Sequence, residues 1–219
     1  MKILVIIPAF NSEKCLPKLI ANIKEHIQDI LVIDDGSIDR TALSSRDLGV
    51  PVIRHDHNMG KGAALKSGFK YAVDHGYEYV ITIDSDGQHD PDYIPLFLKH
   101  FSNSDADLII GSRRWNKLNM PWDRRFSNYI TSRALSLMLH RDIEDSQSGY
   151  RLISIGLIRG VDLKSNKYEL ESEIIIKAIR GGFKIAFLPI QAKYGNGHST
   201  SINRLLDTLR WVRMIFENL

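Results

Sequence analysis

Val80-Ile81-Thr82-Ile83-Asp84-Ser85-Asp86-Gly87-Gln88-His89-Asp90-Pro91 is the stretch that decides the fold of this chain. It begins as an apolar run rich in β-branched residues, which is typical of a buried strand. It ends in an N-cap and first-turn pair, Asp90 and Pro91, which predicts a helix start. The two carboxylates between them, Asp84 and Asp86, lie where open α/β sheets bind ligands, and a hard divalent cation would relieve their mutual repulsion. The alternative is that Asp86 and Asp90 only turn and cap the backbone.

The composition fits one large domain that buries a sizeable core. The chain has 219 residues, 43% of them hydrophobic, and a formal net charge of +3, which gives no indication of nucleic-acid binding. The single cysteine, Cys15, excludes an internal disulfide and a cysteine-based zinc site. The longest apolar run, residues 3–7, is too short to span a membrane, and no signal-peptide pattern precedes it. We therefore expect a cytoplasmic protein, with peripheral contact at the cytoplasmic face of a membrane left open.

Strands and helices alternate along the first half of the chain. The expected strands cover 2–7, 29–34, 50–54, 80–83 and 107–111, with amphipathic helical segments between them. This alternation predicts an α/β domain with a mainly parallel sheet, flanked by helices and joined by right-handed crossovers.

The pattern becomes irregular after about residue 115. We expect a loop or lid over 115–125, a helix over 126–139 and a polar, turn-like segment over 142–151. A helix over 169–180, a strand over 183–189 and an amphipathic helix over 201–219 complete the chain. No repeat or linker divides it, so a single domain over 1–219 is the simplest interpretation.

Polar side chains follow each of the first four expected strands. The four clusters are Asn11 and Glu13; Asp34, Asp35 and Ser37; Asn58 and Lys61; and Asp84, Asp86 and Gln88. Because the carboxyl ends of parallel strands share one edge, these clusters should converge in space. Any one cluster is ordinary turn chemistry, but four together favour a ligand site.

The absence of two known phosphate-binding motifs narrows the range of possible ligands. A dinucleotide fold needs G-x-G-x-x-G after the first strand, where this chain has Pro8. A P-loop needs glycine at His55 and Ser or Thr at Gly62. Phosphate is therefore expected on a metal ion assisted by Lys61, and Asp34 or Asp35 could accept hydrogen bonds from a base or ribose. A nucleotide-sugar donor is the economical interpretation.

Four motifs in this order closely resemble the family 2 glycosyltransferases, which have the GT-A fold. They are Ile7-Pro8-Ala9-Phe10-Asn11-Ser12-Glu13, Asp34-Asp35-Gly36-Ser37-x-Asp39-x-Thr41, Asn58-x-Gly60-Lys61-Gly62 and Asp84-Ser85-Asp86-Gly87-Gln88-His89. Three later motifs resemble the branch with polyprenyl-phosphate (dolichol-phosphate) mannosyl- and glucosyltransferases: Gly111-Ser112-Arg113, Asp145-Ser146-Gln147-Ser148-Gly149-Tyr150-Arg151 and Tyr168-Glu169-x-Glu171-x-Glu173.

The resemblance implies a Rossmann-like nucleotide-sugar half over 1–115 and an irregular acceptor half over 116–219. It places the nucleoside on Pro8, Phe10, Glu13 and Asp35, the pyrophosphate near Lys61, and Mg²⁺ or Mn²⁺ on Asp84, Asp86 and Gln88. Asn11, Asp34 and Ser85 complete the expected donor site. We expect inversion by a single in-line displacement, in which Asp86 acts through the metal.

The acceptor side has several open interpretations. Asp145 is the candidate base or acceptor-side residue, or else a turn aspartate. Arg113 and Arg151 are candidates for holding an acceptor phosphate, because guanidinium groups match phosphate oxygens, or else ordinary arginines paired to acids. The acids Glu169, Glu171 and Glu173 could be only a solvated helix start.

A lipid-phosphate acceptor is the favoured hypothesis, ahead of a saccharide hydroxyl in surface polysaccharide synthesis. A nucleotidyltransferase and a nucleotide-binding regulatory domain without turnover are the further alternatives. The last expected helix has an apolar stripe of Ile202, Leu205, Leu206, Leu209, Val212 and Phe216. That stripe suits a membrane surface, although packing on the domain itself or on a second copy in a homo-oligomer is favoured.

Overall fold

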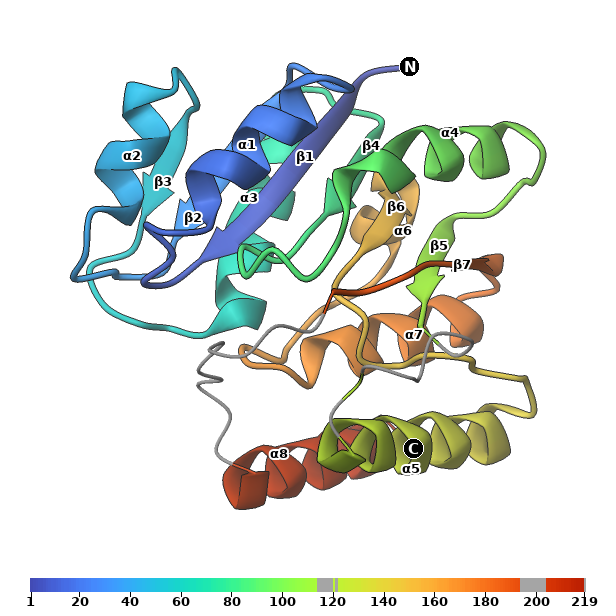
Figure 1. Ribbon diagram of the computed structural model, residues 1–219. Helices are drawn as coiled ribbons and strands as arrows, with labels where there is room; N and C mark the ends of the chain where they lie inside the picture. Colours follow the sequence, from blue (N-terminus) through green and yellow to red (C-terminus); the bar gives the residue numbers. More distant parts are fainter. Residues whose placement is uncertain (114–119, 121, 194–203, 219) are drawn as a thin grey trace.

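The computed structural model describes residues 1–113, 120, 122–193 and 204–218 (Figure 1). Its centre is a seven-stranded sheet in the order β3-β2-β1-β4-β6-β5-β7. The strands are β1 Ile3–Ala9, β2 Ile30–Asp34, β3 Val52–Arg54, β4 Tyr79–Thr82, β5 Leu108–Ser112, β6 Arg151–Ser154 and β7 Ile185–Pro189. The helices are α1 Leu16–Lys24, α2 Thr41–Asp47, α3 Lys61–Asp74, the 3₁₀ turn η1 Pro91–Tyr93, α4 Ile94–Ser102, α5 Trp122–Leu139, α6 Ile155–Gly160, α7 Leu170–Arg180 and α8 Arg204–Glu217.

The predicted α/β class with a mainly parallel sheet is confirmed. Only β6 among these strands runs antiparallel to its neighbours, pairing with β4 on one side and β5 on the other. The other paired strands are parallel, so β1, β2, β4 and β5 all end at one edge. Because β6 runs the other way, it begins at this edge, with Arg151 opposite Thr82 and Ile110.

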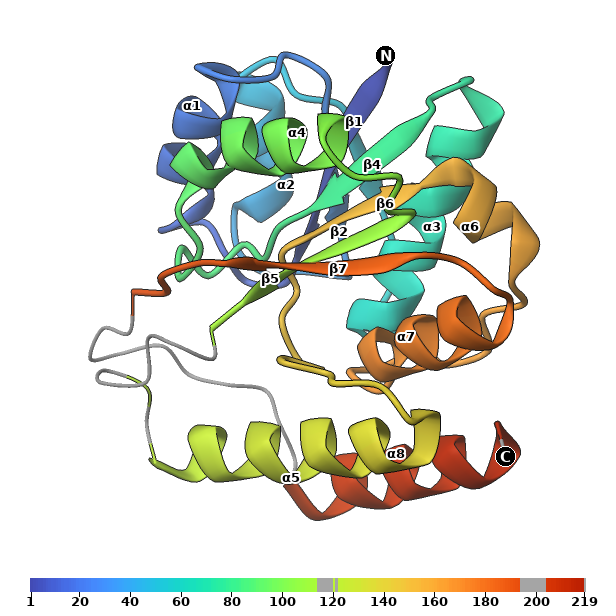
Figure 2. The same cartoon turned by 90° about the vertical axis from the view of Figure 1, so that its right-hand side faces the viewer.

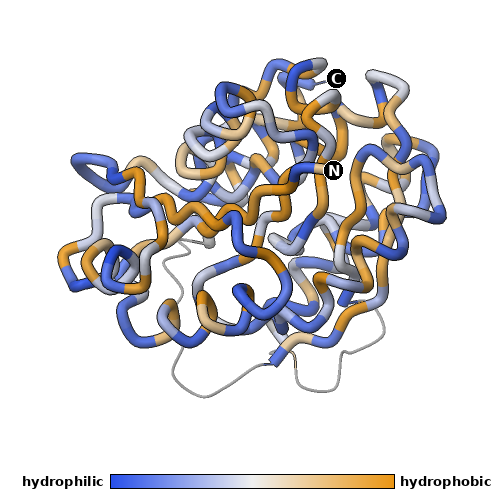
Figure 3. The backbone as a smooth tube through the Cα atoms, turned by 90° about the horizontal axis from the view of Figure 1, so that it is seen from above, coloured by the Kyte–Doolittle hydropathy of each residue, from blue (hydrophilic) through white to orange (hydrophobic). Residues whose placement is uncertain are grey.

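Helices cover both faces of the sheet, and the alternation of side chains along each strand fills both cores. In β1, Leu4 and Ile6 belong to the core beneath α3, α6 and α7, whereas Val5 and Ile7 belong to the core beneath α1 and α4. Burial on both faces explains why β1 is a continuous apolar run. Figure 3 shows the hydrophobic colour along the central strands and the hydrophilic colour on the surrounding loops.

The second half corrects one boundary of the sequence analysis and adds two elements that it missed. Helix α5 begins at Trp122, inside the segment expected to be a loop or lid, while residues 114–119 and 121 lie outside the described residues. The polar segment 142–151 leads directly into β6 and α6, which the sequence analysis missed. A four-residue strand followed by a six-residue helix is too short to establish a recognisable hydrophobic period.

Helices α5 and α8 lie side by side as an extra layer beyond α7, as Figures 1 and 2 show from two directions. The indole Nε1 of Trp211 donates to Ser172 Oγ at 3.0 Å and so joins α8 to α7. Met214 and, from α5, Leu135 are buried in the core next to α7.

The described residues of the α8 stripe do not pack on the domain itself, which was one of the two favoured arrangements; contact with a second copy stays a prediction. Its members Leu206, Leu209, Val212 and Phe216 are exposed, and Trp211, Met214 and Ile215 pack inward instead. Ile202 and the side chain of Leu205 lie outside the described residues. Within the described part of the chain, no helix has both the length and the apolar character needed to cross a bilayer.

Candidate active site

The acidic turn after β4 lies at the edge where the parallel strands end. Asp86 Oδ1 accepts a hydrogen bond from the Gln88 backbone N–H at 3.0 Å. Gly87, between these two residues, has a φ of 74°, which lets the backbone turn at this point. The predicted cap is confirmed, because the Asp90 side chain accepts from the Asp92 N–H at the start of η1.

Lys61 and Asp84, expected from sequence to lie near one another, form an ion pair. Lys61 is the first residue of α3, and its Nζ lies 2.6 Å from Asp84 Oδ1 and 2.6 Å from Glu171 Oε1 on α7. Burial by itself opposes charge on both partners, but the two carboxylates raise the pKa of Lys61, and the ammonium lowers the pKa of Asp84. Lys61 is therefore a permanent cation at the carboxyl end of β4.

Asp35 fixes the loop that carries Lys61. Its Oδ1 accepts from the Met59 N–H at 2.9 Å and its Oδ2 from the Gly60 N–H at 2.7 Å. His55 Nδ1 lies 2.7 Å from Asp35 Oδ1. The buried carboxylate thus holds the two residues before Lys61, a role that the sequence analysis did not anticipate.

The loop after β1 is joined to the loops after β2 and β4. The Asn11 N–H donates to Ser37 Oγ at 2.9 Å, and Asn11 Oδ1 accepts from the Ile38 N–H at 3.0 Å. Ser12 Oγ lies 2.8 Å from Ser85 Oγ. The structure therefore brings these strand ends together.

The remaining expected donor residues line or support this edge. Pro8 is buried in β1, Phe10 is partly exposed, and Glu13 Oε2 accepts from the Arg40 N–H at 3.0 Å. Asp34 is fully buried and shapes the turn after β2, where its Oδ1 accepts from the Ser37 N–H and its Oδ2 lies 3.3 Å from Arg54 Nε. In this arrangement Asp34 supports the loop rather than facing a ligand.

The carboxylate of Asp145, the candidate general base, is paired with Arg113. Its carboxylate receives two hydrogen bonds from the Arg113 guanidinium, at 2.8 and 3.0 Å, and one from the Arg113 backbone N–H at 3.1 Å. Although burial would raise it, the pKa of Asp145 is lowered by Arg113, which makes the carboxylate a weaker base. Asp145 instead fixes Arg113 at the end of β5.

Arg151 is also placed differently from expectation. It is almost completely buried, and its Nε, Nη1 and Nη2 donate to the backbone carbonyls of Ser148, Glu171 and Ser146 at 2.7, 2.7 and 3.1 Å. A guanidinium enclosed in this way braces the loop before β6 and the start of α7. The expectation that Arg151 holds an acceptor phosphate is corrected accordingly.

The glutamates at the start of α7 are not a solvated helix end. Glu171 and Glu173 are both buried, and Glu173 accepts from the Lys164 and Ser165 N–H groups at 2.9 and 2.8 Å. The sequence analysis assigned Glu171 no partner, and its pairing with Lys61 joins residues 110 positions apart. Three acids at alternate positions, beside the apolar run 174–176, were the available signal.

The acidic turn suits a divalent cation. The described residues show no group of three or more His, Cys, Asp or Glu side chains that could hold a metal by themselves. Mg²⁺ is usually bound by one or two carboxylates together with substrate phosphates, and Asp84 and Asp86 are such a pair. Gln88 is buried beside them, with its Oε1 3.4 Å from Arg124 Nη1.

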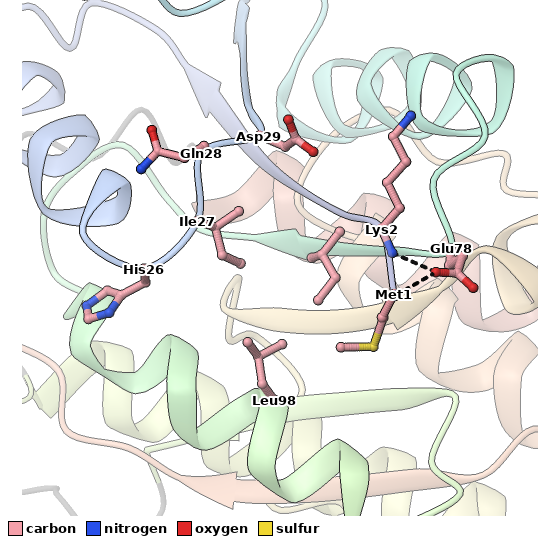
Figure 4. Close-up of a pocket in the computed structure, with 9 residues that line it drawn as sticks. Met1, Lys2, His26, Ile27, Gln28, Asp29, Glu78 and Leu98 are labelled. Atoms are coloured by element: carbon pink, nitrogen blue, oxygen red, sulfur yellow. Dashed lines mark hydrogen bonds and ion pairs between the residues drawn. The ribbon is translucent and has the colours of Figure 1, made fainter.

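A separate open pocket lies at the opposite edge of the sheet (Figure 4). Met1, Lys2, His26, Asp29, Glu78 and Leu98 contribute to its lining. Glu78 accepts from the Lys2 N–H at 2.6 Å and pairs with the N-terminal ammonium. This pocket is at the beginning of β1, far from the strand ends where the polar clusters meet.

Comparison with known proteins identifies the family of this chain. The profile of the family described as "Glycosyl transferase family 2" matches residues 4–166. The chain belongs to glycosyltransferase family 2. This match includes β1, the Lys61 loop, the acidic turn and β6, so the predicted family is confirmed.

Two relatives of this family 2 chain act on lipid phosphates, as their names state. The UDP-N-acetylglucosamine–dolichyl-phosphate N-acetylglucosaminyltransferase of Methanococcus voltae is 32% identical, over 88% of this chain and 86% of that protein. The undecaprenyl-phosphate mannosyltransferase of Micrococcus luteus is 30% identical, over 87% of this chain and 83% of that protein.

The GT-A fold is confirmed by a solved structure. Glucosyl-3-phosphoglycerate synthase from Mycobacterium tuberculosis, in complex with Mg²⁺ and UDP, superimposes with a TM-score of 0.76 at 18% identity. The match covers 99% of this chain and 79% of that protein. The similarity in fold therefore includes α5–α8 as well as the first half of the chain.

Proposed function

We propose that this family 2 chain is an inverting, metal-dependent glycosyltransferase that moves a hexose from a nucleotide sugar to a polyprenyl or dolichyl phosphate. The observation that carries the proposal is the grouping, at one sheet edge, of the Lys61 ammonium, the Asp84 carboxylate and the Arg113 guanidinium. The names of the two relatives support the lipid-phosphate acceptor, and GDP-mannose or a UDP-sugar is the expected donor.

Each charged residue has a role in the proposed reaction. Asp84, Asp86 and Gln88 would hold the divalent cation, which would neutralise charge on the diphosphate leaving group. Lys61 binds the diphosphate and stabilises the negative charge that grows on it as the bond to the anomeric carbon breaks. Phe10, Glu13 and Asp35 border the nucleoside, and Arg113 orients the acceptor phosphate.

The state of Asp145 favours a phosphate acceptor over a sugar hydroxyl. A hydroxyl must lose a proton, and a positioned base typically contributes about 10²–10⁴-fold to such a step. Asp145, the carboxylate expected to be that base, is instead held by Arg113. A polyprenyl phosphate is already anionic at neutral pH and needs orientation rather than deprotonation.

The direct test is turnover of labelled GDP-mannose, UDP-glucose and UDP-N-acetylglucosamine, with Mn²⁺ or with EDTA, and with a short-chain polyprenyl phosphate as acceptor. We expect one donor to yield labelled product that extracts into organic solvent, only with metal and only with the phosphorylated lipid. The unphosphorylated polyprenol is the matched control acceptor.

Other outcomes would favour the alternatives. Labelled saccharide that stays in the aqueous phase would support transfer to a sugar hydroxyl and contradict the lipid acceptor. Nucleotide binding without turnover of any donor, tested with both acceptor types, would support a regulatory domain instead.

The outer face of α5 and α8 supports peripheral contact with a lipid surface. Exposed apolar side chains lie along both helices: Trp122, Phe126, Tyr129, Ile130 and Leu137 on α5, and Leu206, Leu209, Val212 and Phe216 on α8. We call this set the α5–α8 surface. Exposed arginines, Arg125 and Arg133, accompany it. A lipid phosphate lies at a membrane surface, so an apolar and basic face on the acceptor half suits that substrate.

Replacing Leu209 and Phe216 together by glutamate should weaken binding to vesicles that contain anionic phospholipid by about tenfold or more, because two apolar anchors are lost. These side chains are 64% and 71% exposed, so the fold should be retained. Co-sedimentation with vesicles measures the effect, and Leu43→Glu with Leu96→Glu, on α2 and α4, is the matched control pair. Unchanged vesicle binding with loss of self-association in sedimentation would instead make this surface a contact between two copies.

A further inference from the structure

The Lys61 ammonium lies between two carboxylates that differ in access to solvent. Asp84 has 24% of its side chain exposed, whereas Glu171 has only 5%. One oxygen of each carboxylate lies 2.6 Å from Nζ, so the two contacts have the same length. A cation arriving from solvent can therefore reach Asp84 but not Glu171.

The surroundings hold Lys61 and Glu171 in place. A Cβ added at Gly149 would lie 2.5 Å from Asp84 Oδ2 and 2.6 Å from Lys61 Nζ, so the backbone of Gly149 closes one side of the ion pair. The Gly149 carbonyl accepts from Thr82 Oγ1 at 2.8 Å, and the Glu171 carbonyl accepts from Arg151 Nη1 at 2.7 Å. The backbone of Glu171 is thus held and its carboxylate is enclosed, so Asp84 is the partner that another cation can take.

We propose that Lys61 and a divalent cation compete for Asp84, and that Glu171 is the positioning residue that keeps the Lys61 ammonium at the site when the cation binds. This inference rests on the proposed function only in placing the cation on Asp84. An ammonium and a dication cannot share one carboxylate closely without strong repulsion. The anionic diphosphate of the donor attracts Lys61 away from Asp84, so the donor and the cation should each strengthen binding of the other.

The test is Mn²⁺ binding to the full chain, measured by the electron paramagnetic resonance signal of free Mn²⁺, with and without UDP or GDP. Without nucleotide, Lys61→Met should bind Mn²⁺ about tenfold more tightly than the unmodified protein, because the competing charge is gone. The gain in affinity on adding nucleotide should be smaller in this variant. Lys70→Met is the matched control, since Lys70 is on the same helix, 77% exposed and paired with Asp74, and its Mn²⁺ affinity should be unchanged.

Two further variants distinguish competition between Lys61 and Mn²⁺ for Asp84 from a general change in charge and from misfolding. Lys61→Met with Glu171→Gln removes one positive and one negative charge, leaves no buried carboxylate unpaired and should still bind Mn²⁺ more tightly than the unmodified protein. Glu171→Gln alone leaves Lys61 on Asp84 and should weaken nucleotide-free Mn²⁺ binding by several-fold.

The outcomes distinguish this inference from the proposed function. Equal Mn²⁺ affinity of the unmodified protein and both Lys61 variants would overturn the exchange and leave the metal site standing. Mn²⁺ binding that is absent even with nucleoside diphosphate would overturn the metal-dependent function, and the exchange with it.

Discussion

An Asp86→Ala variant should keep its fold and lose metal-dependent binding of the nucleotide-sugar donor. Asp86 is half-buried in the turn after β4, two residues from Asp84, and the two carboxylates are the expected protein ligands of the cation. Without one of them the charge that grows on the leaving diphosphate is poorly neutralised. We expect turnover to fall on the order of 10²–10³-fold or more.

Calorimetric titration of GDP-mannose, UDP-glucose and UDP-N-acetylglucosamine, with and without Mn²⁺, measures the loss of donor binding. Asp92→Ala is the matched control, because Asp92 is six residues further along the chain and its side chain is 78% exposed. It should bind donor as the unmodified protein does. Unchanged metal-dependent binding in Asp86→Ala would refute the metal role of this residue.

The second large effect concerns stability rather than catalysis. Arg151→Ala should lower the free energy of unfolding by about 3–5 kcal/mol, because it leaves three buried carbonyls without their donor and opens a cavity beside β6. Urea denaturation followed by circular dichroism measures the change. Arg213→Ala is the control: Arg213 is an exposed arginine paired with Glu217 on α8, and its loss should cost less than about 1 kcal/mol.

The Arg151 experiment also decides between the sequence-based and the structure-based interpretation of this residue. An Arg151→Ala protein that is as stable as the unmodified one but no longer binds a polyprenyl phosphate would restore the acceptor role expected from sequence. A large loss of stability, detected without any substrate, is what the enclosed guanidinium predicts.

Much of the first half of the chain could be predicted because its signals are local. The run from Val80 to Ile83 is apolar and β-branched, and Asp90 and Pro91 mark a helix start, so a strand, a turn and a helix follow from neighbouring residues alone. Alternation of strands and helices then places successive strand ends at one edge. The sequence alone therefore predicts that Lys61 and Asp84 lie close together.

The second half of the chain was harder to predict because its decisive features are long-range. Arg113 and Arg151 look equivalent in sequence. In the structure, however, Arg113 forms a bidentate ion pair with Asp145, and Arg151 is buried at the start of β6. Which arginine is buried depends on β6, an antiparallel strand of four residues. No local sequence pattern predicts how this strand pairs. Helix α8 likewise has two apolar faces, and periodicity does not tell which one packs inward.

By itself, the sequence determined the α/β class, the family, and the turn that carries Asp84 and Asp86, since each follows from short motifs and from the order in which they occur. Only the tertiary structure decided that Lys61 is shared between Asp84 and Glu171, that Asp145 is paired rather than free, and that the α5–α8 surface faces outward. Helix and strand patterns are set by side chains a few positions apart. Ion pairs and packing faces depend on which distant segments the fold brings into contact, and that choice minimises the free energy of the whole chain.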